Sequence, residues 1–384
     1  MDRSSPSSYV HSRPGWPHYR YDLATLAQPL AAARNRQGIL LGRMEGLGLR
    51  QMVETTLNSL TDEVQQSSAI EGEDLPRDQV RSSLARRLGL DIGGAVQADR
   101  DVDGVVEMTI DATQNYAAPL TPDRLFAWHA ALFPTGRSGL LKIEVGAWRT
   151  GPMQVVSGPL GKERIHYVAP EPERVPELMN DFLAWFESPD GSQDPVLKAA
   201  IAHLWFVQIH SLDDGNGRIG RAVMDMALTR GDAQPMRFYS MSRQIAAELR
   251  DYYDLLEEMG KGDGEITAYL LWFVRCLDRA IGTALLTAGV VLAKAQFWEW
   301  ADTLPLSARQ RKVLSRLVDG FQGNITSEKY GKIADVSKET AIRDINELIG
   351  LGVLVRVDSG GRSTAYKLAP ERLTLPPGIS HQTE

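Results

Sequence analysis

The stretch His210–Arg221, which reads HSLDDGNGRIGR, constrains the fold of this chain more than any other segment. Apolar residues recur at helical spacing on both sides of it, over 197–205 and over 223–228. Between the two patterns, Gly215-Asn216-Gly217 tolerates positive φ and lets successive backbone N–H groups converge on one point. The sequence therefore predicts two helices joined by a tight turn. That turn would lie at the N-terminus of the second helix, where the helix dipole attracts anions.

Two arginines follow this turn at once. Arg218 and Arg221 are three residues apart, so we expect them to share a face of the first turn of the second helix. With the backbone amides of the turn they make a predicted phosphate cradle. The chain contains no GxxxxGK[ST] sequence, which excludes a P-loop as the phosphate site.

His210 and Asp214 place a base and a carboxylate beside the cradle. A lone histidine is often a satisfied core residue, but here His210 is better placed as a general base, because imidazole titrates near neutral pH. Asp214 suits both a helix cap and a ligand of Mg²⁺, which one or two carboxylates bind together with substrate phosphates. A calcium loop is excluded, because Arg218 and Ile219 occupy positions that need a ligand and a glycine. A metal hydrolase built on His210, Asp213 and Asp214 is an alternative, but it gives the glycines and arginines no role.

The same stretch resembles the signature of the Fic family. That signature has a histidine, an aromatic residue two positions later, an acidic residue, Gly-Asn-Gly-Arg, and a second arginine three residues further on. Two positions depart from it: Ser211 stands where proline is common, and Leu212 stands where the aromatic residue anchors the turn. Leucine also fills a core pocket, so we expect weaker anchoring of the turn and unchanged chemistry. The resemblance covers the region from about residue 16 to residue 292.

The stretch Ser67-Ser68-Ala69-Ile70-Glu71-Gly72 resembles the inhibitory helix of the family, which has Ser or Thr, three residues, Glu, and then Gly or Asn. Alone, this pattern would indicate only a solvated helix end. Lying N-terminal to the full motif, it implies that Glu71 pairs with Arg221 in a charge-assisted contact and blocks the site of the γ-phosphate. Ser67, Glu71 and Gly72 are therefore candidate regulatory residues. In some relatives the equivalent glutamate also positions water for removal of AMP.

The resemblance implies transfer of AMP from ATP to a Tyr, Thr or Ser hydroxyl of protein substrates, self-modification included. His210 would accept the proton of the attacking hydroxyl. Asp214 would hold Mg²⁺ against the α- and β-phosphates, and the amides of Gly215–Gly217 would stabilise charge there. Arg218 and Arg221 would bind the outer phosphates, with Arg221 on the γ-phosphate. ATP and Mg²⁺ are therefore the expected cofactors.

Two further features resemble parts of the family's site. Alternating residues and a glycine turn predict a β-hairpin within 145–168. Its stretch Val155-Val156-Ser157-Gly158 resembles the flap that aligns a target segment by strand addition. The alternative is an ordinary surface hairpin. Tyr252 and Tyr253 resemble the tyrosine pair that lies against adenine in relatives, and packing on a helix face is the competing explanation.

The rest of the chain is predicted to be mainly α-helical. The expected fold is a Fic-type helical core with a small β-hairpin flap, plus a C-terminal winged helix-turn-helix. Single helices are expected over 242–259, 265–280 and 290–301, and the hairpin is the only strand pair expected before the C-terminal third. The expected parts are a disordered tail (1–15), an N-terminal helical region with the inhibitory helix (16–100), the catalytic core (101–292), a connector (293–304), the winged helix (305–370) and a disordered tail (371–384).

The segment 305–368 carries the pattern of a winged helix, with three helices and a glycine-tipped strand pair. It has 11 Lys/Arg and 7 Asp/Glu, a balance of +4, whereas the whole chain is at −7. DNA binding and a role in protein docking or homodimer formation are both open for this segment. The basic residues near the expected recognition helix and wing, with one threonine, are Lys338, Thr340, Arg343, Arg356, Arg362 and Lys367.

Composition indicates the setting in which the protein works. The chain has 384 residues and one cysteine, Cys276, which suits a reducing cytoplasm. Its first residues lack the apolar core of a secretory signal, and the apolar run 280–293 is too short to span a bilayer, so we expect no membrane partner. The alternative to an AMP-transferase is a DNA-binding regulator with a nucleotide-sensing Fic-like core. Transfer of a different phosphoryl or nucleotidyl group is the alternative within the enzyme class.

Overall fold

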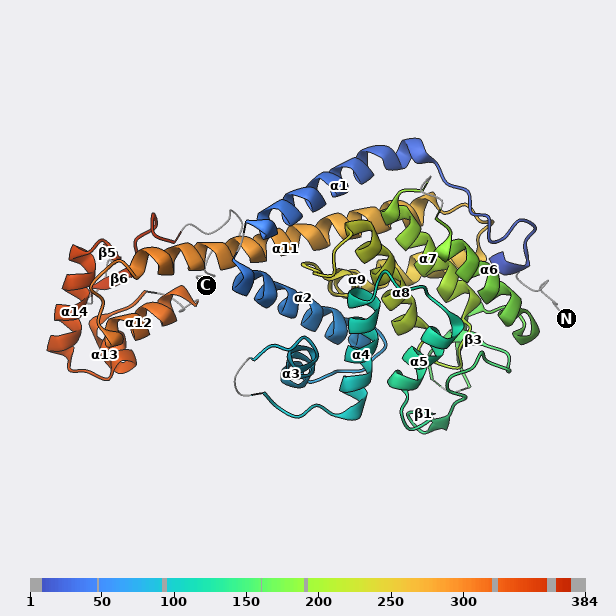
Figure 1. Cartoon of the computed structure of the whole chain (residues 1–384), viewed down its shortest axis with the longest axis horizontal. Helices are drawn as coiled ribbons and strands as arrows, with labels where there is room; N and C mark the ends of the chain where they lie inside the picture. Colours follow the sequence, from blue (N-terminus) through green and yellow to red (C-terminus); the bar gives the residue numbers. More distant parts are fainter. Residues whose placement is uncertain are drawn as a thin grey trace. The chain divides into compact units, whose positions relative to one another are not determined.

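The computed structural model describes residues 9–46, 48–91, 95–159, 161–189, 193–319, 324–357 and 364–373. The chain divides into two compact units, Met1–Thr283 and Ala284–Glu384, and each has its own buried core. Helices dominate both units, which confirms the predicted mainly α-helical fold (Figure 1).

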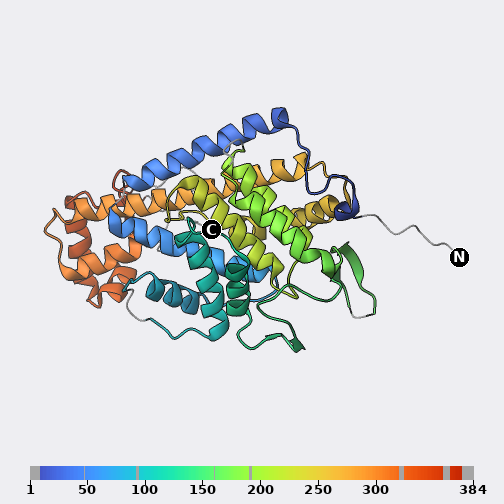
Figure 2. The same ribbon diagram turned by 45° about the vertical axis from the view of Figure 1, so that its right-hand side comes forward.

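The first unit is a helical assembly with two short strand pairs. α1 lies along the first part of α11 in both views, and Arg36 Nη1 lies 2.6 Å from Asp278 Oδ2 at this contact (Figures 1 and 2). The helices of this unit are η1 (Val10–Ser12), α1 (Leu23–Glu45), α2 (Leu49–Ile70), α3 (Arg77–Arg87), α4 (Arg100–Gln114), α5 (Pro122–Leu132), η2 (Pro172–Arg174), α6 (Val175–Glu187), α7 (Pro195–Ile209), α8 (Asn216–Asp232), α9 (Met241–Ala247), α10 (Leu249–Lys261) and the start of α11 (Thr267–Ala301).

α7 and α8 are packed together at the centre of this unit. α7 begins where the Asp194 carboxylate accepts the Val196 N–H at 2.7 Å, with Pro195 in its first turn. The helix is apolar on every side and nearly all of it is buried, as expected for such a helix. α2 packs against α8 and α9. The C-terminal end of α2 therefore lies beside the motif that joins α7 to α8.

Two antiparallel strand pairs lie in this unit. The pair of β3 and β4 confirms the predicted hairpin, and its register shifts once, between Val155 and Val156. The pair of β1 and β2 was not expected, because strands of two residues are too short to show an alternating pattern. The strands are β1 (Arg137–Ser138), β2 (Leu141–Lys142), β3 (Gln154–Ser157) and β4 (Arg164–Val168).

The prediction of one helix over 242–259 was wrong. The helical path breaks at Glu248, whose φ of −118° and ψ of 29° are not helical, and α9 and α10 lie on either side of it. The Glu248 carboxylate accepts hydrogen bonds from Arg279 Nε at 2.6 Å and from Trp272 Nε1 at 3.1 Å. These partners belong to α11, so the break depends on contacts that the local sequence does not display.

The prediction of separate helices over 265–280 and 290–301 was also wrong, because α11 is continuous over 35 residues. Gly282 and Gly289 lie inside it, and each costs only about 1 kcal/mol relative to alanine. By length and apolar composition α11 would suffice to cross a membrane, and no other helix among the described residues passes that test. The test is also passed by core helices, and the first part of α11 buries Tyr269, Phe273 and Leu277 in the first unit.

Residues 9–15, which we expected to be disordered, are ordered. Val10 is buried, and the short helix η1 begins there. Just beyond, Trp16 Nε1 and the Tyr19 hydroxyl both donate to Gln208 Oε1, at 2.9 and 2.7 Å. These aromatic side chains attach the N-terminal segment to α7, which a Ser- and Pro-rich composition does not reveal. Residues 1–8 lie outside the described chain.

After the end of α11, the described residues of the second unit form three helices and an antiparallel strand pair, in the predicted order. A buried cluster that includes Phe297, Leu314 and Ile345 forms its core. The tip of the strand pair (358–363) and residues 374–384 of the expected C-terminal tail lie outside the described residues, and the winged-helix interpretation stays a prediction. The elements are α12 (Ala308–Val318), α13 (Ser327–Ala334), α14 (Lys338–Gly350), β5 (Leu354–Val357) and β6 (Ala365–Leu368).

Candidate active site

The turn between α7 and α8 is held in one shape by its own side chains. Leu212 is fully buried, as expected for a leucine in the anchoring position. The buried Asn216 amide accepts the Leu212 N–H at 3.0 Å and donates to the Leu212 carbonyl at 2.8 Å. We predict Asn216 as part of the phosphate cradle, but both polar atoms of its side chain form hydrogen bonds that close the turn. Only its backbone N–H is left for a ligand.

Gly215 and Gly217 are required here for two different reasons. Gly215 has a φ of +78°, and a Cβ at this position would lie 3.0 Å from Phe133 Cε2. A Cβ on Gly217 would lie 2.0 Å from Glu71 Oε1. The missing side chain of Gly217 thus lets a carboxylate approach the first turn of α8. Since a helix N-terminus attracts anions, this carboxylate occupies the place where a phosphate would bind.

His210 lies at the end of α7 in the left-handed conformation, with a φ of +50°. Such a backbone is uncommon outside glycine and is often found at functional sites. Its Nδ1 is 3.1 Å from the Val207 carbonyl, a contact in which Nδ1–H donates and Nε2 is left as an acceptor. Burial lowers the pKa of His210 below its usual value, and the Val207 hydrogen bond only partly opposes this. The ring is therefore neutral near pH 7, as a general base must be.

Arg149 supports the backbone of the motif, and the sequence did not disclose this role. Its side chain is buried, with Nε donating to the His210 carbonyl at 2.7 Å and Nη1 donating to the Gly151 carbonyl at 2.8 Å. Its backbone N–H also donates to the Ser211 carbonyl at 2.9 Å. Arg149 therefore fixes the backbone on which His210 sits. It lies 61 residues before His210, so no spacing pattern could have indicated it.

Asp214 does not cap α8 in the usual way. Its Oδ1 accepts the N–H of the adjacent Gly215 at 2.6 Å, and its Oδ2 accepts from the Ser138 hydroxyl of β1. Ser138 was not predicted, since β1 was not. No group of three or more His, Cys, Asp or Glu that could hold a metal occurs among the described residues. A single carboxylate completed by phosphate oxygens is nevertheless the usual protein share of a Mg²⁺ site, so Asp214 fits that role.

The predicted contact between Glu71 and Arg221 is present. Arg221 is 1% exposed, and its Nη2 donates to Glu71 Oε1 at 2.8 Å and to the Ser67 carbonyl at 2.7 Å. Its Nε donates to the Ser67 hydroxyl at 2.9 Å. Burial acts to lower the pKa of Arg221, but the nearby Glu71 carboxylate raises it above its ordinary value. Gly72 follows with a φ of +84°, a conformation that favours glycine.

The expectation that Arg218 and Arg221 bind the same ligand stays a prediction, and in the structure Arg218 makes contacts of its own. Arg218 Nη1 lies 2.5 Å from Glu73 Oε2, and its guanidinium lies 5.0 Å from the centre of the Phe133 ring. It lines a different cavity, of about 490 Å³, from the one that contains His210. Glu73 was not predicted, because it lies just outside the inhibitory pattern.

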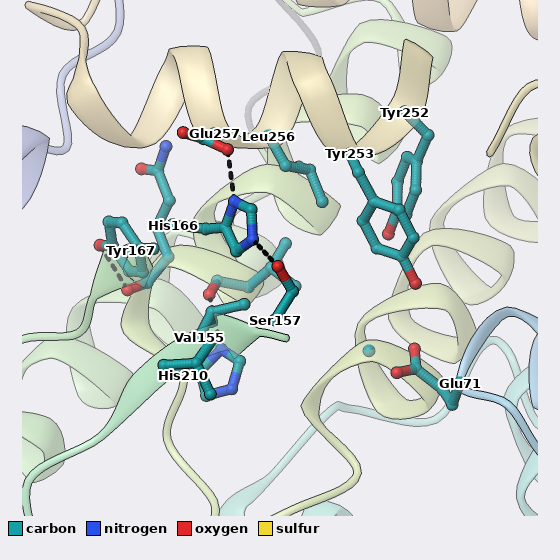
Figure 3. Close-up of a pocket in the computed structure, with 14 residues that line it drawn as sticks. Glu71, Val155, Ser157, His166, Tyr167, His210, Tyr252, Tyr253, Leu256 and Glu257 are labelled. Atoms are coloured by element: carbon teal, nitrogen blue, oxygen red, sulfur yellow. Dashed lines mark hydrogen bonds and ion pairs between the residues drawn. The ribbon is translucent and has the colours of Figure 1, made fainter. Parts of the chain in front are cut away.

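A cavity of about 550 Å³ lies between the α7–α8 turn, the β3–β4 hairpin and α10 (Figure 3). It brings together seven of the fifteen predicted site residues. The other eight, which do not line it, are Ser67, Gly72, Gly158, Asp214, Gly215, Asn216, Arg218 and Arg221. His166, Leu256 and Glu257 also line it and were not predicted. The predicted residues that line it are Glu71, Val156, Ser157, His210, Gly217, Tyr252 and Tyr253.

The two tyrosines of α10 differ in their surroundings. Tyr252 is buried, and its hydroxyl lies 3.1 Å from His203 Nε2, so helix packing explains most of its position. Tyr253 is 45% exposed, and its hydroxyl donates to the Ile70 carbonyl at 2.8 Å. Tyr253 therefore joins α10 to the end of α2 next to Glu71, and it leaves one ring face toward the cavity (Figure 3).

Comparison with known proteins identifies the region that carries this site. Residues 119–228 match the model of the Fic/DOC family, and residues 9–90 match a domain of unknown function (DUF4172). The chain is 33% identical over 120 residues to the protein adenylyltransferase Fic of Nematostella vectensis, covering 31% of this chain and 26% of that protein. It is 29% identical over 220 residues to the protein adenylyltransferase Fic of Aedes aegypti, covering 56% and 40%. The chain thus spans less than half the length of these relatives.

A solved structure supports the fold. The crystal structure of a Fic family protein from Desulfovibrio desulfuricans G20 superposes with a TM-score of 0.51 at 21% identity. The match covers 88% of this chain and 95% of that one. At this level of identity the likeness concerns the fold alone.

Proposed function

Because the chain belongs to the Fic/DOC family, we propose that it transfers AMP from ATP to hydroxyl groups of protein side chains. The observation that carries this proposal is His210. It is neutral, its Nε2 is left as an acceptor, and it lines a cavity next to the open first turn of α8. A hydroxyl placed between this nitrogen and a bound nucleotide would lose its proton as it attacks phosphorus.

Unused hydrogen-bond donors support a polyphosphate ligand. Arg221 Nη1 and Arg218 Nε are buried and have no hydrogen-bond partner in the described part of the chain. Leaving such a donor unpaired costs roughly 1–3 kcal/mol, so a site that keeps two of them is suited to an anionic ligand. Arg221 Nη1 also lies 3.2 Å from the place of a Cβ on Gly217, beside the amides of the turn.

The residues of the turn then have separate roles in the reaction. His210 Nε2 takes the proton of the acceptor hydroxyl, and Arg149 keeps the ring in place through the His210 carbonyl. The amides of Gly215–Gly217 stabilise the negative charge that develops at the phosphates. Asp214 would hold Mg²⁺, which neutralises phosphate charge when it is bound. Arg221 would bind the γ-phosphate.

Glu71 makes this activity autoinhibited in our proposal. Its carboxylate takes one nitrogen of Arg221 and lies over Gly217, so ATP must displace it to bind productively. Glu71 and His210 also line the same cavity. That placement suits a second reaction at this site, in which Glu71 orients water for removal of AMP from a modified protein.

The second unit supplies a binding surface in this proposal. Lys338 and Arg343 are exposed at the start of α14, and Arg356 is exposed on β5. They suit either DNA phosphates or an acidic protein partner, including a second copy of the chain. A gel-shift assay with mixed duplexes at low and moderate salt separates the two, since phosphate contacts weaken steeply as salt rises. A DNA affinity that does not change with salt concentration, or no binding of DNA, would favour the protein partner. The expected cytoplasmic location also stays a prediction.

The test of the function is mass spectrometry of a Glu71→Gly protein incubated with ATP and Mg²⁺. We expect a mass increase of one AMP minus water. The His210→Ala change in the same background should abolish AMP transfer to other proteins while ATP still binds, because it removes the base and leaves the cradle. A protein that binds ATP but forms no adduct in either background would instead be a nucleotide-sensing regulator. An adduct of a different mass would identify another transferred group.

A further inference from the structure

A hydroxyl, an imidazole and a carboxylate form a continuous relay on the wall of the cavity. The Ser157 hydroxyl lies 2.6 Å from His166 Nε2, and His166 Nδ1 lies 2.5 Å from Glu257 Oε2 (Figure 3). Ser157 is on β3, His166 is on β4 and Glu257 is on α10. All three line the cavity that contains His210.

The strand pairing directs His166 into this relay. Val155 pairs with Tyr167 and Val156 pairs with Ile165, so His166 is the extra residue of a β-bulge. A bulge changes the direction of its side chain relative to a regular ladder, and bulges are frequent beside active sites. The bulge therefore accounts for a histidine that reaches both the neighbouring strand and α10.

Glu257 is held as a carboxylate by the groups around it. Lys261 Nζ lies 2.5 Å from its Oε1, and Arg164 Nη2 lies 2.8 Å from the same atom. The hydrogen bond from Lys261, followed by those of His166 and Arg164, lowers the pKa of Glu257 to about 2. An ionised carboxylate at Nδ1 keeps the proton on that nitrogen and leaves Nε2 facing the Ser157 hydroxyl as an acceptor.

A nucleophile bonded to a base, with the base oriented by a third group, is the arrangement of an activated hydroxyl. We propose that Ser157 is the residue at which the chain modifies itself with AMP, with His166 as its general base and Glu257 as the positioning residue. This proposal rests on the proposed AMP transfer. Ser157 is exposed to solvent and lines the cavity, so its hydroxyl can contact a nucleotide bound there without a movement of β3.

The step balances without any group beyond ATP. The Ser157 Oγ–H proton passes to His166 Nε2 while Oγ forms a bond to the α-phosphorus. The bond from that phosphorus to the oxygen that bridges to the β-phosphate breaks, and pyrophosphate leaves with the electron pair. The imidazolium, which is partly exposed, then gives its proton to water. The product is a phosphodiester on Ser157 that can no longer donate to His166.

The test maps the site of labelling in the full-length Glu71→Gly protein incubated with ATP and Mg²⁺. Trypsin cuts after Arg149 and Lys162, and the resulting peptide contains two hydroxyl side chains, Thr150 and Ser157. Fragmentation of that peptide assigns the AMP to one or the other. We expect AMP on Ser157. The matched control is Thr150→Ala, which alters the other hydroxyl of the same peptide and should leave the labelling unchanged.

Variants of the relay then separate chemistry from packing. His166→Ala should slow labelling of Ser157 by roughly 100-fold, the typical contribution of a general base. Added imidazole should restore part of that rate in His166→Ala and have no effect on the parent protein. Rescue by a free base is not expected if His166 only holds the hairpin in place. Glu257→Gln should also slow the labelling, and Glu257→Asp should keep more of it.

The outcomes distinguish this inference from the proposed function. AMP found only on other residues would overturn the assignment of Ser157 and leave the AMP transfer standing. No adduct on any peptide, with no pyrophosphate released from ATP, would overturn both. Labelling of Ser157 that is unchanged in His166→Ala, or lost without rescue by imidazole, would overturn the base role of His166.

Discussion

The contact between Glu71 and Arg221 can be tested by removing one charge. Glu71→Gln keeps the size of the side chain but replaces the carboxylate that accepts Arg221 Nη2 at 2.8 Å. A hydrogen bond to a charged group contributes about 1.5–3 kcal/mol. Since the Glu71 side chain is 33% exposed, solvent screens the pair, and the lower part of that range, about 1.5–2 kcal/mol, applies.

This free energy sets the expected change in ATP affinity. In the proposed function the γ-phosphate competes for Arg221, so weakening the internal contact by this amount should tighten ATP binding by about 10- to 30-fold. Arg221 itself should stay in place, because its bonds to the Ser67 carbonyl and hydroxyl do not involve Glu71. Titration calorimetry with ATP and Mg²⁺ measures the effect directly.

The matched control is Glu54→Gln, on the same helix. Glu54 also pairs with an arginine, Arg81, at 2.9 Å, but on the surface of the protein. We expect its ATP affinity to stay within about twofold of the parent, because exposed pairs contribute little. If Glu71→Gln bound ATP no more tightly than Glu54→Gln and modified itself no faster, the reasoning that Glu71 competes with the nucleotide would be refuted.

Three further changes have defined outcomes. Glu73→Gln, added to Glu71→Gly, should raise ATP affinity by a further few-fold in calorimetry, because it frees Arg218 from a contact that is partly exposed; no change would show that Arg218 does not reach the ligand. Asn216→Ala should lower the free energy of unfolding by about 2–4 kcal/mol in urea titration, since it leaves two buried backbone groups of the turn unpaired; a loss below 1 kcal/mol would contradict this. Burial lowers the pKa of His203 to about 3, so between about pH 6.5 and 3 the unfolded chain binds a proton that the folded chain does not. The free energy of unfolding should therefore fall as pH drops through this window. The His203→Gln protein should lose less stability over the same window.

The sequence predicted best the elements whose ends are marked locally. α2 ends at Ile70, immediately before the Glu71-Gly72 pair of the inhibitory pattern. The contact of Glu71 with Arg221 was predictable because both residues stand in recognisable patterns. Leu212 could be assigned to the core because any apolar residue at that position faces inward.

The sequence could not show contacts whose partners lie far apart in the chain. Arg149 and Ser138 support the motif from segments that carry no pattern of their own. The break at Glu248 and the order of residues 9–15 likewise depend on tertiary partners. The relay of Ser157 depends on a bulge, which strand alternation does not predict.

The two hydrogen bonds between Arg221 and Ser67 have a consequence for the proposed regulation by Glu71. The two bonds from Arg221 to Ser67 on α2 do not involve the Glu71 carboxylate, so they should persist when that carboxylate is withdrawn. Withdrawal therefore needs only a rotation about the side-chain bonds of Glu71, with no rebuilding of the backbone. Inhibition of this kind depends on competition between ATP and the Glu71 carboxylate for Arg221. The rate of the proposed AMP transfer should therefore rise gradually with the ATP concentration and lack a sharp threshold.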